Sequence, residues 1–321
     1  MLVYNNIEQN LLKKSSLALG MFDGVHTGHK SVINSAKDMA HKYNCPCVVL
    51  SFSTHPQYIT ARTPTPQLTT LSERLELFEK EGVDIAIIID FDKEFSQIPA
   101  EDYISKILVG SLNAKAISIG YDHRFGRGKR GNQYLLKDFA YTYNYEIKVV
   151  PPVTVEGQIV SSSIIRKMLK FGDITLSNKL LGRDFKLIGQ VETGAKRGRE
   201  LGFPTANIKP FSNVLIPACG VYAVEIQIEN STLKHTAVLN IGFRPTFADR
   251  NKPTLEAFII DFNEDLYDKF LNIYFKCRIR DEKKFSSPEE LIKQIHKDIA
   301  TVKEISATGL CNHKNTLLNK V

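Results

Sequence analysis

Residues 20–30 read GMFDGVHTGHK, and this stretch decides how the first half of the chain is interpreted. It follows an apolar run at 17–21 and leads into 29–43, where apolar residues recur at helical spacing. Two interpretations compete for a turn in this place. It is either a helix cap with incidental histidines or a backbone cradle that binds phosphate at a helix N-terminus.

The glycines and histidines of this turn suit a phosphate. Three glycines allow tight turns and close approach of a ligand to the backbone: Gly20, Gly24 and Gly28. His26 and His29 are three residues apart at the start of the helix, so both side chains can reach one anion. The pattern HxGH alone favours the cap, but its place after the first strand of an α/β pattern favours the phosphate site.

The rest of the first half alternates strand and helix patterns, which predicts a parallel sheet covered on both faces. The expected strands are 17–21, 46–52, 84–90, 115–120 and 145–150. The expected helices are 29–43, 71–82, 99–112, 132–143, 162–171 and 173–181.

The pattern changes after Gly182. Four β-rich segments follow without a helix-length pattern between them, which predicts a closed antiparallel sheet: 220–229, 234–242, 254–262 and 270–280. The last helix is expected over 286–305, with Ser287 as its cap, Pro288 at its first position and Glu290 completing a capping box. We therefore expect two domains, 1–182 and 183–321.

Composition limits the classes of function. The formal charge of +7 favours polyanionic partners but does not separate nucleic acids from nucleotides. No stretch reaches the roughly 18 to 20 apolar residues of a membrane span, and the N-terminus lacks the pattern of a signal peptide. We expect a cytoplasmic protein that does not bind membranes.

The cysteines give little sign of disulfides. They are odd in number and scattered: Cys45, Cys47, Cys219, Cys277 and Cys311. A disulfide framework is therefore not expected, and all five are interpreted as thiols.

Further motifs follow along the first half. The stretches SFSTHPQ (51–57), IGYDHRFGRGKRGN (119–132) and VSSSIIRKML (160–169) come in this order. Arg166 is expected in the first turn of a helix that Ser161 to Ser163 cap, where a guanidinium and free N–H groups suit a phosphate. The four basic residues of 124–130 are either a solvated loop or a lid that faces phosphate.

The most specific stretch of the second half is GQVETGAKRGRELGFPTANI (189–208). It is no Walker A loop, because a Gly-Lys-Ser/Thr ending is missing, but glycines among basic residues suit a diphosphate. Thr205 and Asn207 alternate on one face of an extended stretch, and their oxygens could hold Mg²⁺. Without context, Pro-Thr-Ala-Asn is better interpreted as a turn.

Together these motifs resemble the bifunctional riboflavin kinase/FAD synthetase family of bacteria, over nearly the whole chain. The resemblance implies an N-terminal α/β nucleotidyltransferase domain, Rossmann-like with an HxGH loop. It also implies a C-terminal riboflavin kinase domain, a six-stranded all-β barrel with a terminal helix. At four positions the chain departs from the family's usual residues: Met21, Ser53, Thr54 and His123.

The resemblance also implies roles for individual residues. In the first domain His26 and His29 would lie along the ATP triphosphate, and Arg166 would hold phosphates. In the second domain Thr205 and Asn207 would bind Mg²⁺ and Glu256 would be the catalytic base, although strand alternation alone makes Glu256 a solvent-facing residue. The expected nucleotide-binding residues are Gly20, Phe22, Asp23, Gly24, Gly28, Asp122, Ser162, Ser163, Gly194, Lys196, Gly198, Arg199, Gly202 and Pro204. The expected flavin-binding residues are His55, Pro56, Arg124 and Phe125.

The function implied is flavin cofactor biosynthesis from riboflavin, FMN and ATP. The C-terminal domain would phosphorylate riboflavin to FMN, and the N-terminal domain would adenylylate FMN to FAD with release of pyrophosphate. An alternative is a riboflavin kinase whose adenylyltransferase half is weak or serves another acceptor. A nucleic-acid-binding regulator is a rival from another class, but the chain has no helix-turn-helix, RRM or zinc motif, so no nucleic acid partner is expected.

Overall fold

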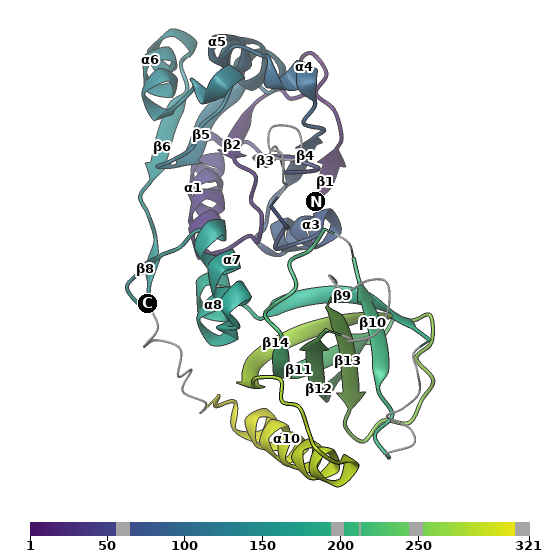
Figure 1. The fold of residues 1–321 in the computed structure, drawn as a ribbon. Coiled ribbons are helices and arrows are strands. Elements are labelled where there is room, and N and C mark those ends of the chain that lie inside the picture. The colour runs from purple at the N-terminus through teal and green to yellow at the C-terminus, as the bar shows by residue number, and fades with distance from the viewer. Residues whose placement is uncertain (56–64, 194–201, 212, 244–252, 312–321) are drawn as a thin grey trace. The chain divides into compact units, whose positions relative to one another are not determined.

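The computed structural model describes residues 1–55, 65–193, 202–211, 213–243 and 253–311. Contacts within the chain divide it into two compact units, Met1–Ser162 and a second that begins at Ser163 (Figure 1). This division assigns the helices at 162–181 to the second unit. The expected functional boundary after residue 182 concerns activity and stays a prediction.

The first unit contains a six-stranded parallel sheet in the order β1-β4-β3-β2-β5-β6. Its strands are β1 (Leu2–Tyr4), β2 (Ser15–Leu19), β3 (Cys47–Phe52), β4 (Ile85–Ile89), β5 (Ala114–Gly120) and β6 (Glu146–Val150). From β2 the chain first adds β3 and β4 on one side, and it later adds β5 and β6 on the other. The strand order therefore reverses between β2 and β5, and such reversal points hold ligands in α/β sheets.

Helices cover both faces of this sheet, which confirms the prediction from the alternating pattern. The helical segments of this unit are α1 (Thr27–Tyr43), α3 (Leu71–Lys80), α4 (Lys93–Ser96), α5 (Ala100–Asp102), η1 (Tyr103–Ser111), η2 (Arg127–Lys129) and α6 (Gln133–Tyr143). Leu17 and Leu19 of β2 pack in one core cluster with η1 and α6, and Ala18 packs in another with α1 and α3. Successive strand residues point to opposite faces, so a sheet buried on both sides needs apolar residues at each position.

Two local features differ from the prediction. The segment 99–112 is helical as expected, but most of it is a π-helix in which Leu112 N donates to Ile107 O at 3.0 Å. Its i→i+5 bonding is not visible in an apolar periodicity. Strand β1 was not predicted, because three residues at a sheet edge are too few to show a pattern.

The second unit is a closed six-stranded antiparallel barrel in the order β10-β13-β12-β11-β14-β9, which confirms the predicted closed sheet. Its strands are β9 (Phe185–Glu192), β10 (Ala206–Pro210), β11 (Gly220–Ile228), β12 (Lys234–Gly242), β13 (Thr254–Ile259) and β14 (Phe270–Arg280). Its helices are α7 (Ser162–Phe171), α8 (Ile174–Leu181) and α10 (Pro288–Thr308), and the hairpin of β7 (Thr154–Val155) and β8 (Gln158–Ile159) precedes α7.

Helix α10 packs on the outer face of the barrel. Val302 and Ile305 contact a cluster that includes Val221 and Ala223 of β11. Ser287 caps the helix as predicted, since its side chain accepts the N–H of Glu290. In a capping box the glutamate side chain also accepts the backbone N–H of the cap residue. Here the Glu290 carboxylate accepts instead from Ser286, one residue before the cap.

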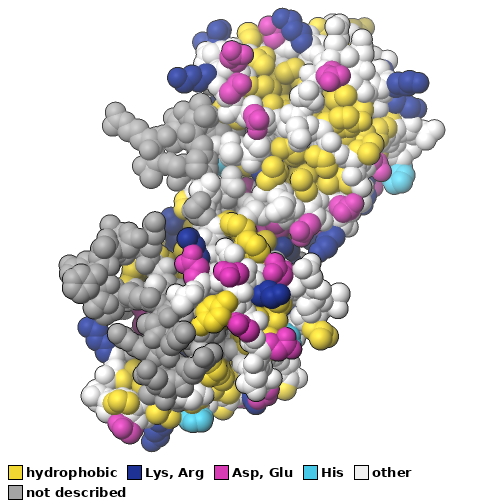
Figure 2. All heavy atoms as spheres, turned by 90° about the vertical axis from the view of Figure 1, so that its right-hand side faces the viewer, with side chains coloured by type: hydrophobic (Ala, Val, Ile, Leu, Met, Phe, Trp, Pro, Cys, Tyr) yellow, Lys and Arg dark blue, Asp and Glu magenta, His cyan; other side chains and the backbone are white. Residues whose placement is uncertain are grey.

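Figure 2 shows one face of the described residues. Lys and Arg side chains are interspersed there with Asp and Glu. A nucleic-acid-binding protein usually gathers its basic residues into one stripe or patch. This face offers no such patch. No helix within the described part of the chain is long and apolar enough to cross a membrane.

The cysteine interpretation needs a correction. Cys277 of β14 and Cys311, which follows α10, form a disulfide. Cys45, Cys47 and Cys219 are free thiols, as expected. No local pattern indicates the pair, because the two cysteines are 34 residues apart and only the docking of α10 on β14 brings them together.

We predict that this disulfide stabilises the second unit. Without reductant, Cys311→Ser should lower the free energy of unfolding of this unit by about 2–4 kcal/mol, because the unfolded chain regains the freedom that the cross-link removes. Denaturant unfolding measures the difference, which should vanish when the wild type is reduced. Cys219→Ser, at a free cysteine of the same unit, is the control. Equal losses in the two variants would contradict the prediction.

Candidate active sites

The turn between β2 and α1 adopts an unusual backbone conformation. Phe22, Gly24 and Val25 all have positive φ, at +52°, +86° and +36°. Glycine adopts such angles freely, whereas a phenylalanine or a β-branched valine does so at a cost that surrounding contacts must offset. A strained turn at the carboxyl edge of a parallel sheet is typical of a ligand-binding loop.

His26 and His29 lie against each other at the N-terminus of α1. Their rings stack with centroids 3.5 Å apart and planes 16° apart. His26 is the N-cap, and its Nδ1 accepts the backbone N–H of His29 at 3.2 Å, which leaves Nε2 as the protonated nitrogen of the neutral ring. A side chain on Gly28 would come within 3.3 Å of the His26 ring. The first turn of α1 has no acidic residue, so the helix dipole and both imidazoles favour an anion here.

Asp23 bonds to the turn that precedes α3. Its carboxylate accepts the N–H groups of Leu68 and Thr69 at 2.9–3.1 Å, and it also accepts the Thr69 hydroxyl. The Thr69 hydroxyl in turn accepts the N–H of Gly24 at 3.0 Å. Ser162, another predicted nucleotide-binding residue, donates to the Asp23 carbonyl at 2.8 Å. Asp23 is 2% exposed, and its hydrogen bonds fix the shape of the loop.

Other predicted residues of the loop serve its shape as well. Phe22 is 1% exposed and packs edge-on against Phe78 of α3 and against His29. A side chain on Gly20 would meet the Phe22 ring at 3.1 Å. Gly20 therefore permits the ring to fold back under the turn.

The segment after β5 lies across the reversal point of the sheet from the histidine loop. Asp122 and Arg124 are exposed, as a ligand-facing role requires. Phe125 is 7% exposed and packs in the core against Tyr103, with ring centroids 5.2 Å apart. His123 stacks on Phe125, and its Nε2 is buried without a hydrogen-bond partner among the described residues. Burial lowers the pKa of His123 to about 4, so this imidazole is neutral at pH 7.

The remaining residues predicted for adenylyl transfer are only partly described. His55 is half-buried just after β3, and Pro56 lies outside the described residues. Ser163 and Arg166 lie on α7, where Arg166 is 7% exposed.

The barrel brings three polar side chains of neighbouring strands into one row. Asn207 of β10 pairs with Glu256 of β13, and Glu256 pairs with Asn240 of β12. Directly paired residues of antiparallel strands have side chains on the same face. The next residues along, Ile208 and Leu255, are buried on the opposite face, inside the barrel. Asn240 was not among the predicted residues, because only the strand register shows that it neighbours Glu256.

This row suits a divalent cation. Thr205 lies two residues before Asn207 in an extended stretch, so the two side chains share a face. Oxygen donors are the ligands that Mg²⁺ prefers, and Thr205 supplies a hydroxyl and Asn207 an amide oxygen beside the carboxylate of Glu256. No cluster of three or more His, Cys, Asp or Glu residues within the described ranges offers another metal site.

The other predicted residues near this row are described in part. Gly202 has a φ of +83°, and Pro204 is exposed. The predicted diphosphate residues Gly194, Lys196, Gly198 and Arg199 lie outside the described part of the chain.

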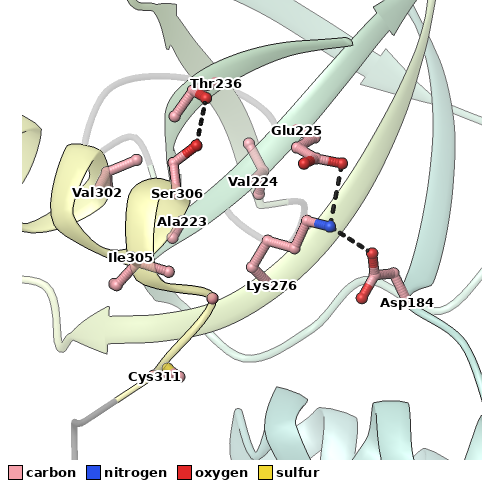
Figure 3. A pocket seen from close by; sticks show the side chains of 11 residues that line it. Asp184, Ala223, Val224, Glu225, Thr236, Lys276, Val302, Ile305, Ser306 and Cys311 are labelled. Carbon is pink, nitrogen blue, oxygen red and sulfur yellow. Dashed lines mark hydrogen bonds and ion pairs between the residues drawn. The ribbon is translucent and has the colours of Figure 1, made fainter.

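A cavity of about 300 Å³ lies elsewhere on the barrel, between α10 and strands β11, β12 and β14 (Figure 3). Lys276 reaches Asp184 at 2.7 Å and Glu225 at 3.0 Å in its wall, and Thr236 bonds to Ser306 at 2.9 Å. The lining charges are thus paired with one another. None of the predicted site residues lines this cavity.

Comparison with known proteins assigns a different family model to each half of the chain. A family model described as FAD synthetase matches residues 8–164, and one described as riboflavin kinase matches residues 181–306. The bifunctional riboflavin kinase/FMN adenylyltransferase of Buchnera aphidicola is 36% identical over 90% of this chain and 93% of its own. The protein of the same name from Bacillus subtilis is 34% identical over 89% and 90%.

The chain belongs to the bifunctional riboflavin kinase/FMN adenylyltransferase family. A crystal structure titled macrolide-efflux protein from Streptococcus pneumoniae shares its fold, with a TM-score of 0.83 and 31% identity. The alignment covers 94% of this chain and 99% of that one. Family membership agrees with the resemblance that the motifs predicted, and it extends over both units.

We predict that His123 makes the first unit sensitive to acid. The folded imidazole has its pKa lowered from 6.5 to about 4, so the unfolded chain binds more protons between these values. Stability is then complete above pH 6.5 and falls as the pH drops toward 4. His123→Phe should remove on the order of 1–3 kcal/mol of this loss by pH 4. Thermal unfolding at each pH measures it, with His41→Gln at an exposed histidine as control. Parallel pH profiles for His123→Phe and wild type would contradict it.

Proposed function

We propose that this chain phosphorylates riboflavin to FMN in its second unit and adenylylates FMN to FAD in its first. The observation that carries the proposal is that a chain of the bifunctional family stacks His26 on His29 at the N-terminus of α1 and pairs Asn207 with Glu256 on the barrel. We place the functional boundary after residue 182, which the start of the riboflavin kinase match at residue 181 supports.

In the kinase reaction the primary hydroxyl of riboflavin attacks the γ-phosphorus of ATP, and ADP leaves. The hydroxyl proton must be accepted as the new bond forms, and a carboxylate within hydrogen-bond reach performs this step. We assign it to Glu256, which lies half-buried in the polar row. Thr205 and Asn207 would hold Mg²⁺, which neutralises phosphate charge when it is bound.

In the adenylylation reaction a phosphate oxygen of FMN attacks the α-phosphorus of ATP, and pyrophosphate leaves. No protein nucleophile is needed, because the attacking phosphate is already an anion. The protein has to align the two phosphates and stabilise the added negative charge. The imidazoles of His26 and His29 stack at the N-terminus of α1, where the helix dipole favours the added negative charge.

A second candidate is a riboflavin kinase whose first unit adenylylates slowly or uses another acceptor. It is favoured by the four departures from the family's usual residues at Met21, Ser53, Thr54 and His123. Given FMN, ATP and Mg²⁺, the purified chain should form FAD if the leading proposal holds. Absence of FAD alongside normal FMN formation from riboflavin would establish this second candidate instead.

We predict that two substitutions separate the activities. Glu256→Gln should lower kcat of the kinase about 10²- to 10⁴-fold, because the base is lost, and leave FAD formation from FMN unchanged. His26→Asn should do the reverse, since asparagine preserves an N-cap acceptor for α1 but removes the imidazole. Chromatography of FMN and FAD measures both products. A folded variant that loses both activities would overturn the division of labour.

We also predict that Asn207 sets the metal requirement of the kinase. Asn207→Ala should raise the Mg²⁺ concentration for half-maximal FMN formation about tenfold or more, because an oxygen ligand is lost. Asn240→Ala is the matched control, since Asn240 flanks Glu256 on its other side. An equal shift in both variants would remove Asn207 from the proposed metal site.

A further inference from the structure

Arg74 of α3 is the largest side chain that is completely buried in the described structure, at 0% exposure. Burial lowers the pKa of its guanidinium to about 10, against the opposing effect of the Asp23 carboxylate, so the group is charged at pH 7. A buried charge is costly unless hydrogen bonds replace its hydration. The bonds that Arg74 makes therefore indicate what it does.

The guanidinium bonds mainly to backbone carbonyls. Nη1 donates to Met21 O at 2.9 Å and to Ser51 Oγ at 3.2 Å. Nη2 donates to Phe52 O and Ser53 O, both at 2.9 Å. The Ser51 hydroxyl donates in turn to Met21 O at 2.9 Å, which closes the network.

These carbonyls belong to two different loops of the same site. Met21 begins the turn that leads from β2 to His26, and Phe52 and Ser53 begin the segment that leads from β3 to His55. Strands β2 and β3 are adjacent and parallel, so both loops leave the sheet at one edge. A planar guanidinium bonded to both loops fixes the distance between them.

Hydrogen bonds from the turn before α3 hold the histidine loop at a second place. Thr69, two residues before α3, accepts the N–H of Gly24 and donates to Asp23. The start of α3 and its preceding turn thus hold the loop at Met21, Asp23 and Gly24. Phe22, which has a positive φ, lies between these points, and Val25, which also has one, follows directly after them. The cost of that strained backbone is offset here.

We propose that Arg74 is a positioning residue for adenylyl transfer, which sets the spacing between the histidine loop that binds ATP and the loop beyond β3 that faces FMN. This inference rests on the proposed function of the first unit. A purely stabilising role is disfavoured by the Nε–H, which is buried without a hydrogen-bond partner among the described residues. An apolar side chain would fill the same space without that cost.

The test compares three variants by the kinetics of FAD formation from FMN. Arg74→Met keeps the length of the side chain and removes every donor. Arg74→Lys keeps the charge but cannot bond to both loops with one planar group. Leu77→Ala, one turn later on α3 and 8% exposed, is a control for stability, since it should cost about 2–5 kcal/mol without removing a hydrogen bond to either loop.

We expect Arg74→Met to lower kcat/KM for adenylyl transfer about 10- to 100-fold, with raised KM for both ATP and FMN, because small misplacements of reacting groups are costly. Arg74→Lys should recover part of this loss. Leu77→Ala should keep the wild-type KM values despite its lower unfolding temperature. FMN formation from riboflavin by the same samples is the internal standard and should be unchanged in all three.

The outcomes are distinguishable. Wild-type KM values in folded Arg74→Met, or equal kinetic losses in Arg74→Met and Leu77→Ala, would overturn the positioning role. If Arg74→Met does not fold, Ser51→Ala tests the positioning role in its place, because it removes one hydrogen-bond partner of Arg74. It should raise both KM values, and unchanged values would overturn the proposal. Wild-type protein that forms no FAD from FMN would instead refute the proposed function itself.

Discussion

The first unit depends on hydrogen bonds that hold a strained turn above the sheet. A loop with positive φ at Phe22 and Val25 would relax if nothing constrained it. Asp23 and Arg74 constrain it through buried polar contacts with the backbone on both sides. A polar cluster in a low-dielectric interior is rigid when its members are paired. The stacked histidines that we propose to bind ATP therefore lie on a loop whose shape is fixed in advance, and such preorganisation accelerates a transfer without a protein nucleophile.

In the second unit, the strand register determines on which face of the barrel the polar side chains lie. In a closed antiparallel barrel each residue faces either the packed interior or the outer surface, and its partners across the strands face the same way. A shift of one residue would turn Glu256 inward and bring Leu255 out. The apolar residues inside the barrel thus determine the position of the polar row outside. The proposed catalytic carboxylate and the proposed metal ligands are held by the same core that stabilises the fold.

Much of this architecture could be predicted from local patterns. The apolar positions of α1 were identified correctly from their spacing, because the same residues that make a helix amphipathic also bury one face of it. The cap at Ser287 was likewise confirmed. Features that depend on contacts between distant segments were missed: the π-helix at 103–111, the disulfide of Cys277 with Cys311, and the roles of Asn240 and Arg74. Arg74 in particular looked like an ordinary helix residue, and only its burial reveals its partners.

The sequence by itself determined the two fold classes, the family and the residue types that each reaction needs. It could do so because periodicity, caps and glycine-rich motifs act over a few residues. The tertiary structure decided which way each side chain faces. The carboxylate of Asp23, a predicted nucleotide-binding residue, is directed at the backbone of Thr69, and Phe125, a predicted flavin-binding residue, packs in the core. Their binding roles stay predictions. Such orientations follow from the packing of segments far apart in the chain, which no local pattern records.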